Sequence, residues 1–172
     1  MKKRHATPLL LPGMVMLALA TLSAVPPRPA QAAGDPIVVI VNSSNPVDNV
    51  SMSELKKLFM SDRSKWDTGK AVAPVIVTAG APERTAFLKI VCGMNDADFG
   101  KYFVAAAFNG KSATPPKEVS SSQGVKAVVA SAPGAIGFVK GLDFHGDGSD
   151  GGVKSVKVDG IAAGDAGYKL RM

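Results

Sequence analysis

The chain has 172 residues, 46% of them hydrophobic, and a formal net charge of +6. Much of that charge lies in the first 32 residues, in Lys2, Lys3, Arg4 and Arg28, and the remainder of the chain carries only +2. No basic stripe interleaved with aromatic residues is present, so the composition argues against a nucleic acid partner. The remaining 140 or so residues suffice for one domain with a substantial core, but not for two lobes of ordinary size.

Residues 1–32 have the pattern of a secretory signal peptide. A basic start precedes the mostly apolar stretch Leu9–Leu22, and Ala30-Gln31-Ala32 has the small-x-small pattern of a cleavage site. A membrane-spanning helix needs roughly 20 apolar residues, so the sequence favours a cleaved signal over the alternative of a retained anchor. We therefore expect export to the periplasm.

The first elements of the exported part alternate between strand and helix patterns. Ile37–Val41 is an unbroken β-branched run, which predicts a buried strand. A polar loop, Asn42–Pro46, follows it, and Ser51 or Ser53 begins a helix. Val72–Thr78 predicts the second strand. The expected inner face of the helix consists of Leu55, Leu58 and Phe59.

The segment Thr78–Phe87 is the most informative part of the sequence. A β-branched run ends in a loop of small residues, and a helix follows from about Pro82 to Cys92. Such a helix start leaves backbone N–H groups without partners and favours anions through the helix dipole. We expect a ligand-binding loop here, although Glu83 adds a negative charge where an anion would lie.

The second half of the chain continues the alternation. Asn95 or Asp96 begins a helix that ends at Asn109-Gly110, and Ser121 or Ser122 begins another. Strands alternating with helices predict α/β layers around one sheet. Apolar positions on the two helices are Phe99, Phe103, Ala106 and Ala107 on the first, and Val125, Val128 and Val129 on the second. The expected strands are Ala135–Val139 and, at a sheet edge, Val153–Val158.

The sequence contains no recognisable catalytic or metal-binding set. Cys92 is the only cysteine, lies late in an apolar helix, and is interpreted as a small buried hydrophobe. The Asp- and Gly-rich loop that begins at Asp143 partly resembles a calcium loop, but Lys154 stands where a glutamate ligand is needed. His145 lacks a neighbouring nucleophile. We therefore expect neither an enzyme nor a bound cofactor or metal.

Several segments, taken in order, resemble one known family. They are Asn42-Ser43-Ser44-Asn45-Pro46, Leu58-Phe59, Lys65-Trp66, Gly80 to Phe87, and Pro133-Gly134-Ala135-Ile136-Gly137-Phe138. Together they resemble the phosphate-binding proteins of periplasmic ABC transporters (PstS-like) over nearly all of residues 36–170. The resemblance implies a three-layer αβα single lobe of the periplasmic binding protein-like II type, with a mixed sheet, over residues 33–172.

The resemblance also implies a ligand and shows where this chain departs from the family. Family members hold an oxyanion between two lobes, with serine and threonine hydroxyls of a glycine loop and a preceding arginine. In this chain Ala81, Pro82 and Glu83 stand at the serine, second glycine and threonine positions. Two hydroxyl donors and one N–H group are therefore missing, and a carboxylate is added.

Two functional hypotheses follow from the resemblance. The first is a periplasmic solute-binding-type domain with weak affinity for a small oxyanion; the second is an envelope protein-interaction or sensory module that has lost its ligand. A homodimer is a further prediction. The alternative roles are a surface or paired charge for Arg84 and turn residues for the two serines. The predicted ligand-binding residues are Ser43, Ser44, Thr78, Gly80, Arg84 and Thr85.

Overall fold

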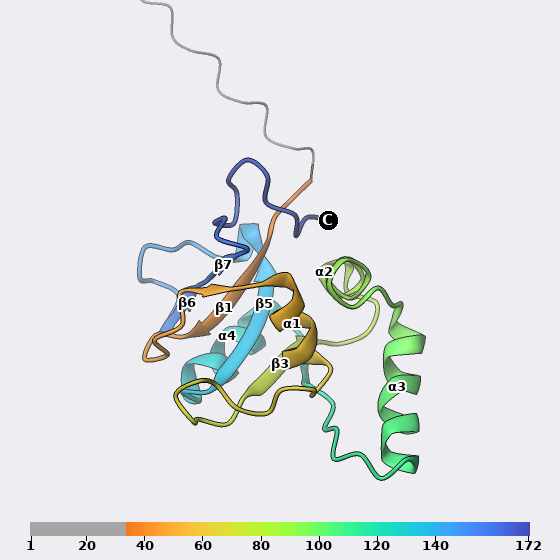
Figure 1. Ribbon diagram of the computed structural model, residues 1–172. Coiled ribbons are helices and arrows are strands. Elements are labelled where there is room, and N and C mark those ends of the chain that lie inside the picture. The colour runs from red at the N-terminus through yellow and green to blue at the C-terminus, as the bar shows by residue number, and fades with distance from the viewer. Residues whose placement is uncertain (1–33) are drawn as a thin grey trace, which may run out of the picture.

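A computed structural model describes residues 34–172; the predicted signal peptide lies outside the described residues. A mixed five-stranded sheet with the order β4-β3-β5-β1-β6 forms its centre (Figure 1). Strand β3 is parallel to β4 and β5, whereas β1 is antiparallel to β5 and β6. The strands are β1 (Ile37–Asn42), β3 (Ala73–Val77), β4 (Lys117–Val119), β5 (Ala135–Lys140) and β6 (Val153–Ser155), and a separate parallel pair joins β2 (Asn49–Val50) to β7 (Lys157–Val158).

The helices begin where the sequence predicts. Ser51 caps α1 (Met52–Phe59) in a capping box with Glu54, and Asn95 and Ser121 cap their helices by accepting from main-chain N–H groups. The other helical elements are α2 (Pro82–Phe87), which continues as the π-helical turn η1 (Leu88–Cys92), then α3 (Asp96–Phe108), α4 (Ser122–Ser131) and the 3-10 turn η2 (Gly141–Asp143).

Alternating residues of β5 show that helices cover both faces of the sheet. A Cβ atom on Gly137 would lie 2.5 Å from Val125 of α4, so this helix packs directly on one face of the strand. Phe138 points to the other face, where its ring stacks 4.0 Å from that of Phe87, and Phe87 lies 4.7 Å from Phe59 of α1. The predicted three-layer αβα lobe with a mixed sheet is confirmed.

Two local predictions need correction, and one strand was missed. Val153–Val158 is not one edge strand, because only β6 lies at the sheet edge while β7 pairs with β2. Strand β4 was not predicted, since it has three residues, two of them charged, directly after a proline-rich connector. Ala107 is exposed rather than on the inner face of α3.

The strand directions divide the loops between two opposite ends of the sheet. We call the end where β3, β4 and β5 finish the carboxyl edge; the loop Thr78–Ala81 and Lys140 lie there. The other end is the amino edge. Because β1 runs against β5, pairing Ile37 with Lys140, the polar loop after Asn42 lies at the amino edge. Within residues 34–172, no helix is both long and apolar enough to cross a bilayer.

Candidate functional site

The loop at the carboxyl edge has the predicted strand–turn–helix geometry. Thr78 donates its main-chain N–H to Val119 at 2.8 Å, which fixes the loop against β4. Gly80 is exposed and has a φ of +89°, a conformation that glycine adopts without strain. Ala81 is the N-cap of α2 and supplies no side-chain hydrogen bond, and Pro82 follows it. The helix start therefore has no side-chain cap, and the exposed Gly80 lies just before it.

Arg84 does not face a ligand. Its side chain is only 5% exposed, and its guanidinium donates to the Val77 carbonyl at 2.8 Å, to Glu118 at 2.7 Å, and to Asp96. These contacts link the first turn of α2 to β3, β4 and the start of α3. The structure therefore places the Arg84 guanidinium away from the predicted ligand site; the charge is paired, as its alternative role expects, but it is buried rather than on the surface.

Glu83 also points into the protein. Its side chain is 5% exposed and lies 3.5 Å from the ammonium of Lys140, the last residue of β5. Among the described residues, its Oε2 atom has no hydrogen-bond partner. A carboxylate in the first turn suits the helix dipole. It also repels an anion at the same helix end, and the Lys140 charge offsets part of that repulsion.

Two predicted threonines remain at the carboxyl edge with Gly80. Thr78 and Thr85 are both exposed, and the Thr85 hydroxyl donates to the Ala81 carbonyl at 3.3 Å. Thr78, Gly80 and Thr85 thus flank the uncapped start of α2. They are the three predicted site residues that the structure brings together with accessible groups.

Ser43 and Ser44 do not belong to this group, because they lie at the amino edge. Both are exposed, and Ser44 donates its N–H and its hydroxyl to the Asn42 side chain at 2.9 and 2.6 Å. Asn42 in turn donates to the carbonyls of Val129 and Ala130 at 3.0 and 2.7 Å. The prediction of one shared site is wrong, since the direction of β1 separates these serines from Gly80. Their alternative role as turn residues fits these contacts.

A cavity of about 360 Å³ at the carboxyl edge, lined mostly by polar residues, was not predicted from the sequence. It lies between the start of α4 and the turn after β5. Its ammonium group, on Lys126, is already paired with Asp150 at 3.0 Å. The run Ser120-Ser121-Ser122 before a helix is the sequence signal that could have indicated it. The lining residues are Ser121, Ser122, Gln123, Lys126, Leu142, Asp143 and His145.

Asp150 anchors the glycine-rich loop beside this cavity. Burial opposes its ionisation, but the N–H groups of Gly146 and His145 and the ammonium of Lys126 outweigh burial and lower the Asp150 pKa to about 2. The loop is therefore held by a carboxylate that binds main-chain groups. Within the described residues, no group of three His, Cys, Asp or Glu side chains is arranged to hold a metal ion.

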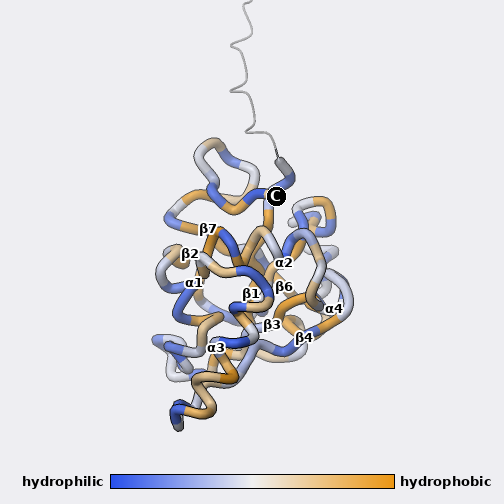
Figure 2. Tube along the Cα trace, turned by 90° about the vertical axis from the view of Figure 1, so that its right-hand side faces the viewer, coloured by the Kyte–Doolittle hydropathy of each residue, from blue (hydrophilic) through white to orange (hydrophobic). Residues whose placement is uncertain are grey.

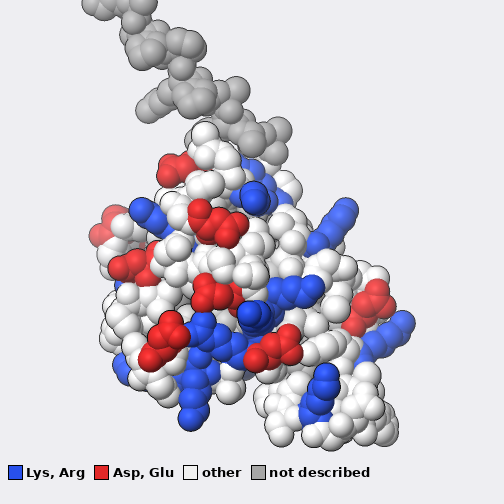
Figure 3. Space-filling view, in the orientation of Figure 1, with Lys and Arg blue, Asp and Glu red and all other residues white. Residues whose placement is uncertain are grey.

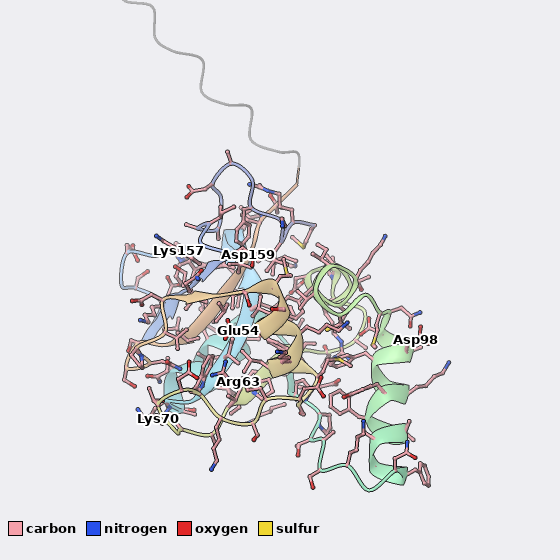
Figure 4. The ribbon with its side chains drawn as sticks, viewed as in Figure 1. Glu54, Arg63, Lys70, Asp98, Lys157 and Asp159 are labelled. Atoms are coloured by element: carbon pink, nitrogen blue, oxygen red, sulfur yellow. The ribbon has the colours of Figure 1, made fainter. Side chains whose placement is uncertain are left out.

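A second cavity, of about 340 Å³, lies at the amino edge between the segments that precede β3 and β4. Its cation Arg63 faces Glu54 at 2.7 Å, as Figure 4 shows, and also pairs with Asp67. Trp66 closes the neighbouring surface, donating its ring N–H to the Gly134 carbonyl at 2.9 Å. Arg63 and Lys126 are thus both engaged in ion pairs within the chain, and Lys117 also lines the second cavity.

Cys92, the remaining candidate for a reactive group, has the surroundings of a core residue. Cys92 is buried, and burial raises the pKa of its thiol to about 11, so it remains protonated as a core residue. Charges of both signs are interspersed over the face drawn in Figure 3.

Comparison with known proteins places this architecture in one fold class. No protein-family model matches the chain. A protein from Clostridium perfringens, assigned as a phosphate ABC transporter substrate-binding protein and solved with bound phosphate, is similar with a TM-score of 0.62 and 23% identity, over 79% of this chain and 52% of its own. An ABC-type phosphate transport receptor from Vibrio cholerae is similar with a TM-score of 0.57 and 19% identity, over 73% and 46% of the two chains.

The fold is therefore that of the phosphate ABC transporter substrate-binding proteins, as the sequence resemblance implies. The chain spans about half the length of the solved structures it matches. A single lobe of a two-lobe architecture accounts for this coverage. At these identities the likeness concerns the fold, and the ligand of this chain is a separate question.

Proposed function

We propose that this chain is an exported solute-binding lobe that binds a small oxyanion weakly at its carboxyl edge. The observation that carries the proposal is the start of α2, which has no side-chain cap and follows the exposed Gly80. Ligands of open α/β sheets lie outside the carboxyl ends of the strands, which is where this loop is. The solved structure from Clostridium perfringens, which shares the fold, contains phosphate.

The proposed contacts are main-chain N–H groups and hydroxyls rather than a cation. Thr78, Gly80 and Thr85 flank the helix start, while Arg84 is engaged with Asp96 and Glu118. Pro82 has no N–H to donate, and Glu83 adds a negative charge. We expect a dissociation constant in the millimolar range, since the contacts proposed here all come from one lobe.

Calorimetric titration of the exported protein with phosphate, sulfate and molybdate tests this function. Binding in the millimolar range or tighter that is weakened by Gly80→Val supports it, because a β-branched residue is strained at this φ and covers the N–H groups. Heat that is unchanged in this variant would place the anion elsewhere. No heat and an unchanged melting temperature at high phosphate would refute oxyanion binding.

The second candidate is an envelope protein-interaction or sensory module without a ligand. The internal ion pairs of Arg84 and Glu83 favour it, because both charged side chains of the loop stabilise the lobe instead of facing outward. This candidate predicts no response to any oxyanion and recovery of an envelope protein after cross-linking in cells. Export itself is tested by N-terminal sequencing of the periplasmic fraction, with Ala33 as the expected first residue.

A further inference from the structure

The cavity between the start of α4 and the turn after β5 is lined by two polar side chains that the protein itself does not engage. Ser122, the first residue of α4, is only 8% exposed and lines the cavity. Among the described residues its hydroxyl has no hydrogen-bond partner, although buried hydroxyls are nearly always bonded. On the other wall, the carboxylate of Asp143 forms no ion pair or hydrogen bond within residues 34–172. Both groups are therefore available to a ligand.

The start of α4 supplies further donors and a positive partial charge. Helix α4 lies at the periphery of the molecule in Figure 2 and has ten residues, so its macrodipole is developed. Ser121 caps the helix by accepting from the N–H of Gly124 at 3.1 Å. In the described part of the chain, the N–H groups of Ser122 and Gln123 have no acceptor, and both residues line the cavity. This wall suits a carboxylate.

Lys126 holds the two walls together without a ligand. It lies one turn after Ser122 on the same side of α4, and its ammonium donates to the Asp143 carbonyl at 2.8 Å and to the Asp150 carboxylate at 3.0 Å. The positive charge of Lys126 is thus balanced by Asp150, and the Asp143 carboxylate is left without a counter-ion. The cavity is therefore formed in advance, with a helix start on one side and a negative charge on the other.

We propose that this cavity binds a small zwitterion, namely an α-amino acid with an aliphatic side chain. The carboxylate of the ligand accepts from the N–H groups of Ser122 and Gln123 and from the Ser122 hydroxyl, and its ammonium faces Asp143. Leu142, which is 75% exposed and lines the cavity, contacts the aliphatic side chain. The cavity volume of about 360 Å³ lies within the range of small-molecule pockets.

The charges around the cavity select a ligand that carries both signs. A simple anion at the start of α4 lies close to the carboxylates of Asp143 and Asp150, which repel it. A simple cation beside Asp143 faces the positive end of the helix dipole and leaves the free N–H groups without an acceptor. An amino acid brings an acceptor and a cation within a few bonds of each other. The site is also distinct from the one proposed at Gly80, because it uses the start of α4 and not that of α2.

Nuclear magnetic resonance titration of the ¹⁵N-labelled exported protein with L-leucine tests the site. We expect saturable shifts of the Ser122 and Gln123 amides and a dissociation constant of about 1 mM. N-acetyl-leucine lacks the ammonium and leucinamide lacks the carboxylate, so each should bind about tenfold more weakly or worse. Equal affinities for leucine and N-acetyl-leucine, or no saturable shift up to about 20 mM leucine, would overturn the proposal.

Asp143→Asn tests the partner of the ammonium. Leucine should bind about tenfold more weakly to this variant, whereas N-acetyl-leucine should bind more tightly because the repulsion of its carboxylate is removed. Asp147→Asn is the matched control, since Asp147 is an exposed aspartate of the same loop and does not line the cavity. The same change of affinity in both variants would refute the role of Asp143.

Ser122→Ala separates ligand binding from protein stability. The hydroxyl has no partner in the folded chain, so its removal should leave the melting temperature unchanged or slightly raised, while leucine affinity should fall by about fivefold. Ser131→Ala, at the other end of α4, removes an exposed hydroxyl that is bonded to Val128 and should not affect leucine binding. A Ser122→Ala variant with a lower melting temperature and unchanged leucine affinity would show that the hydroxyl is only structural.

Gly80→Val distinguishes this site from the proposed oxyanion site. The substitution should weaken phosphate binding and leave leucine binding unchanged, because Gly80 does not line the cavity at α4. Leucine binding can therefore succeed or fail independently of phosphate binding. A loss of leucine affinity in Gly80→Val would place the amino acid at α2 and contradict the proposal.

Discussion

The two ends of the central sheet carry similar polar loops but use them differently. At the amino edge, Asn42 satisfies main-chain groups of α4, and Ser44 is bound to Asn42. At the carboxyl edge, the loop before α2 leaves a helix start without a cap, while the charged side chains behind it are paired internally. The hydroxyl-bearing loop at the amino edge thus binds other parts of the chain, whereas the turn at the carboxyl edge leaves Gly80 exposed.

Removing the Arg84 guanidinium should have the largest effect. Arg84→Ala leaves Asp96 and Glu118 beside a vacated interior position, and we expect the free energy of unfolding to fall by about 3 kcal/mol in urea denaturation. Arg63→Ala is the matched control, because Arg63 also binds two carboxylates but its side chain is 24% exposed. The Arg63→Ala variant should lose only about 1 kcal/mol of its free energy of unfolding. Equal losses would mean that the burial of Arg84 is not what stabilises the carboxyl edge.

Removing the Asn42 hydrogen bonds at the amino edge should have the next largest effect on the free energy of unfolding. Asn42→Ala deprives the carbonyls of Val129 and Ala130 of a donor and should lower the free energy of unfolding by about 2 kcal/mol. Ser44→Ala removes an exposed hydroxyl and should cost no more than about 0.5 kcal/mol. Neither change should alter the heat of phosphate titration. A loss of phosphate binding in the Ser44→Ala variant would indicate that Ser44 belongs to the ligand site after all.

Neutralising Glu83 sharpens the comparison at the carboxyl edge. Glu83→Gln keeps the shape of the side chain and removes its charge, so phosphate should bind about fivefold tighter, corresponding to about 1 kcal/mol. Asp67→Asn makes the same charge change at an exposed position near the amino edge and should leave the affinity nearly unchanged. Calorimetry compares the two variants. Equal increases in phosphate affinity in the two variants would indicate an effect of net charge and not of a local site at Glu83.

The smallest expected effect concerns the loop held by Asp150, which connects the two edges. Its pKa is lowered from about 3.8 in its ordinary state to about 2 in the folded protein. The corresponding stability is fully present above about pH 4 and is lost as the pH falls toward 2. Because the loop that Asp150 holds is exposed to solvent, which screens part of this contribution, we expect a loss of about 1 kcal/mol. Denaturation at several pH values should show a shallower acid slope for Asp150→Asn; an unchanged slope would exclude this role.

The sequence predicted the elements of this fold well because their signals are local. β-branched runs marked β1 and β3, and Ser51, Asn95 and Ser121 marked helix starts through their short polar side chains. Strand β4 escaped prediction because three residues carry no period, and its strand conformation depends on pairing with β3.

The candidate site was predicted in part. The exposed turn at Gly80 followed from the change of pattern between Val77 and Pro82, a local signal. The inward direction of the Arg84 side chain could not be predicted in this way, because its partner Glu118 is 34 residues away in the sequence. The sequence analysis grouped Ser43 and Ser44 with Gly80 because a residue pattern does not specify the direction of a strand. In the structure β1 runs antiparallel to β5, so the two serines lie at the other edge.

The amino acid order by itself determined the αβα layers, the resemblance in fold and the strand–turn–helix that keeps Gly80 accessible, since these depend on propensity, period and caps. Only the tertiary structure decided which loops share an edge and which charges face each other. Those outcomes depend on strand direction and on pairings between residues that are distant in the sequence, where a single antiparallel strand moves a loop to the opposite end of the sheet.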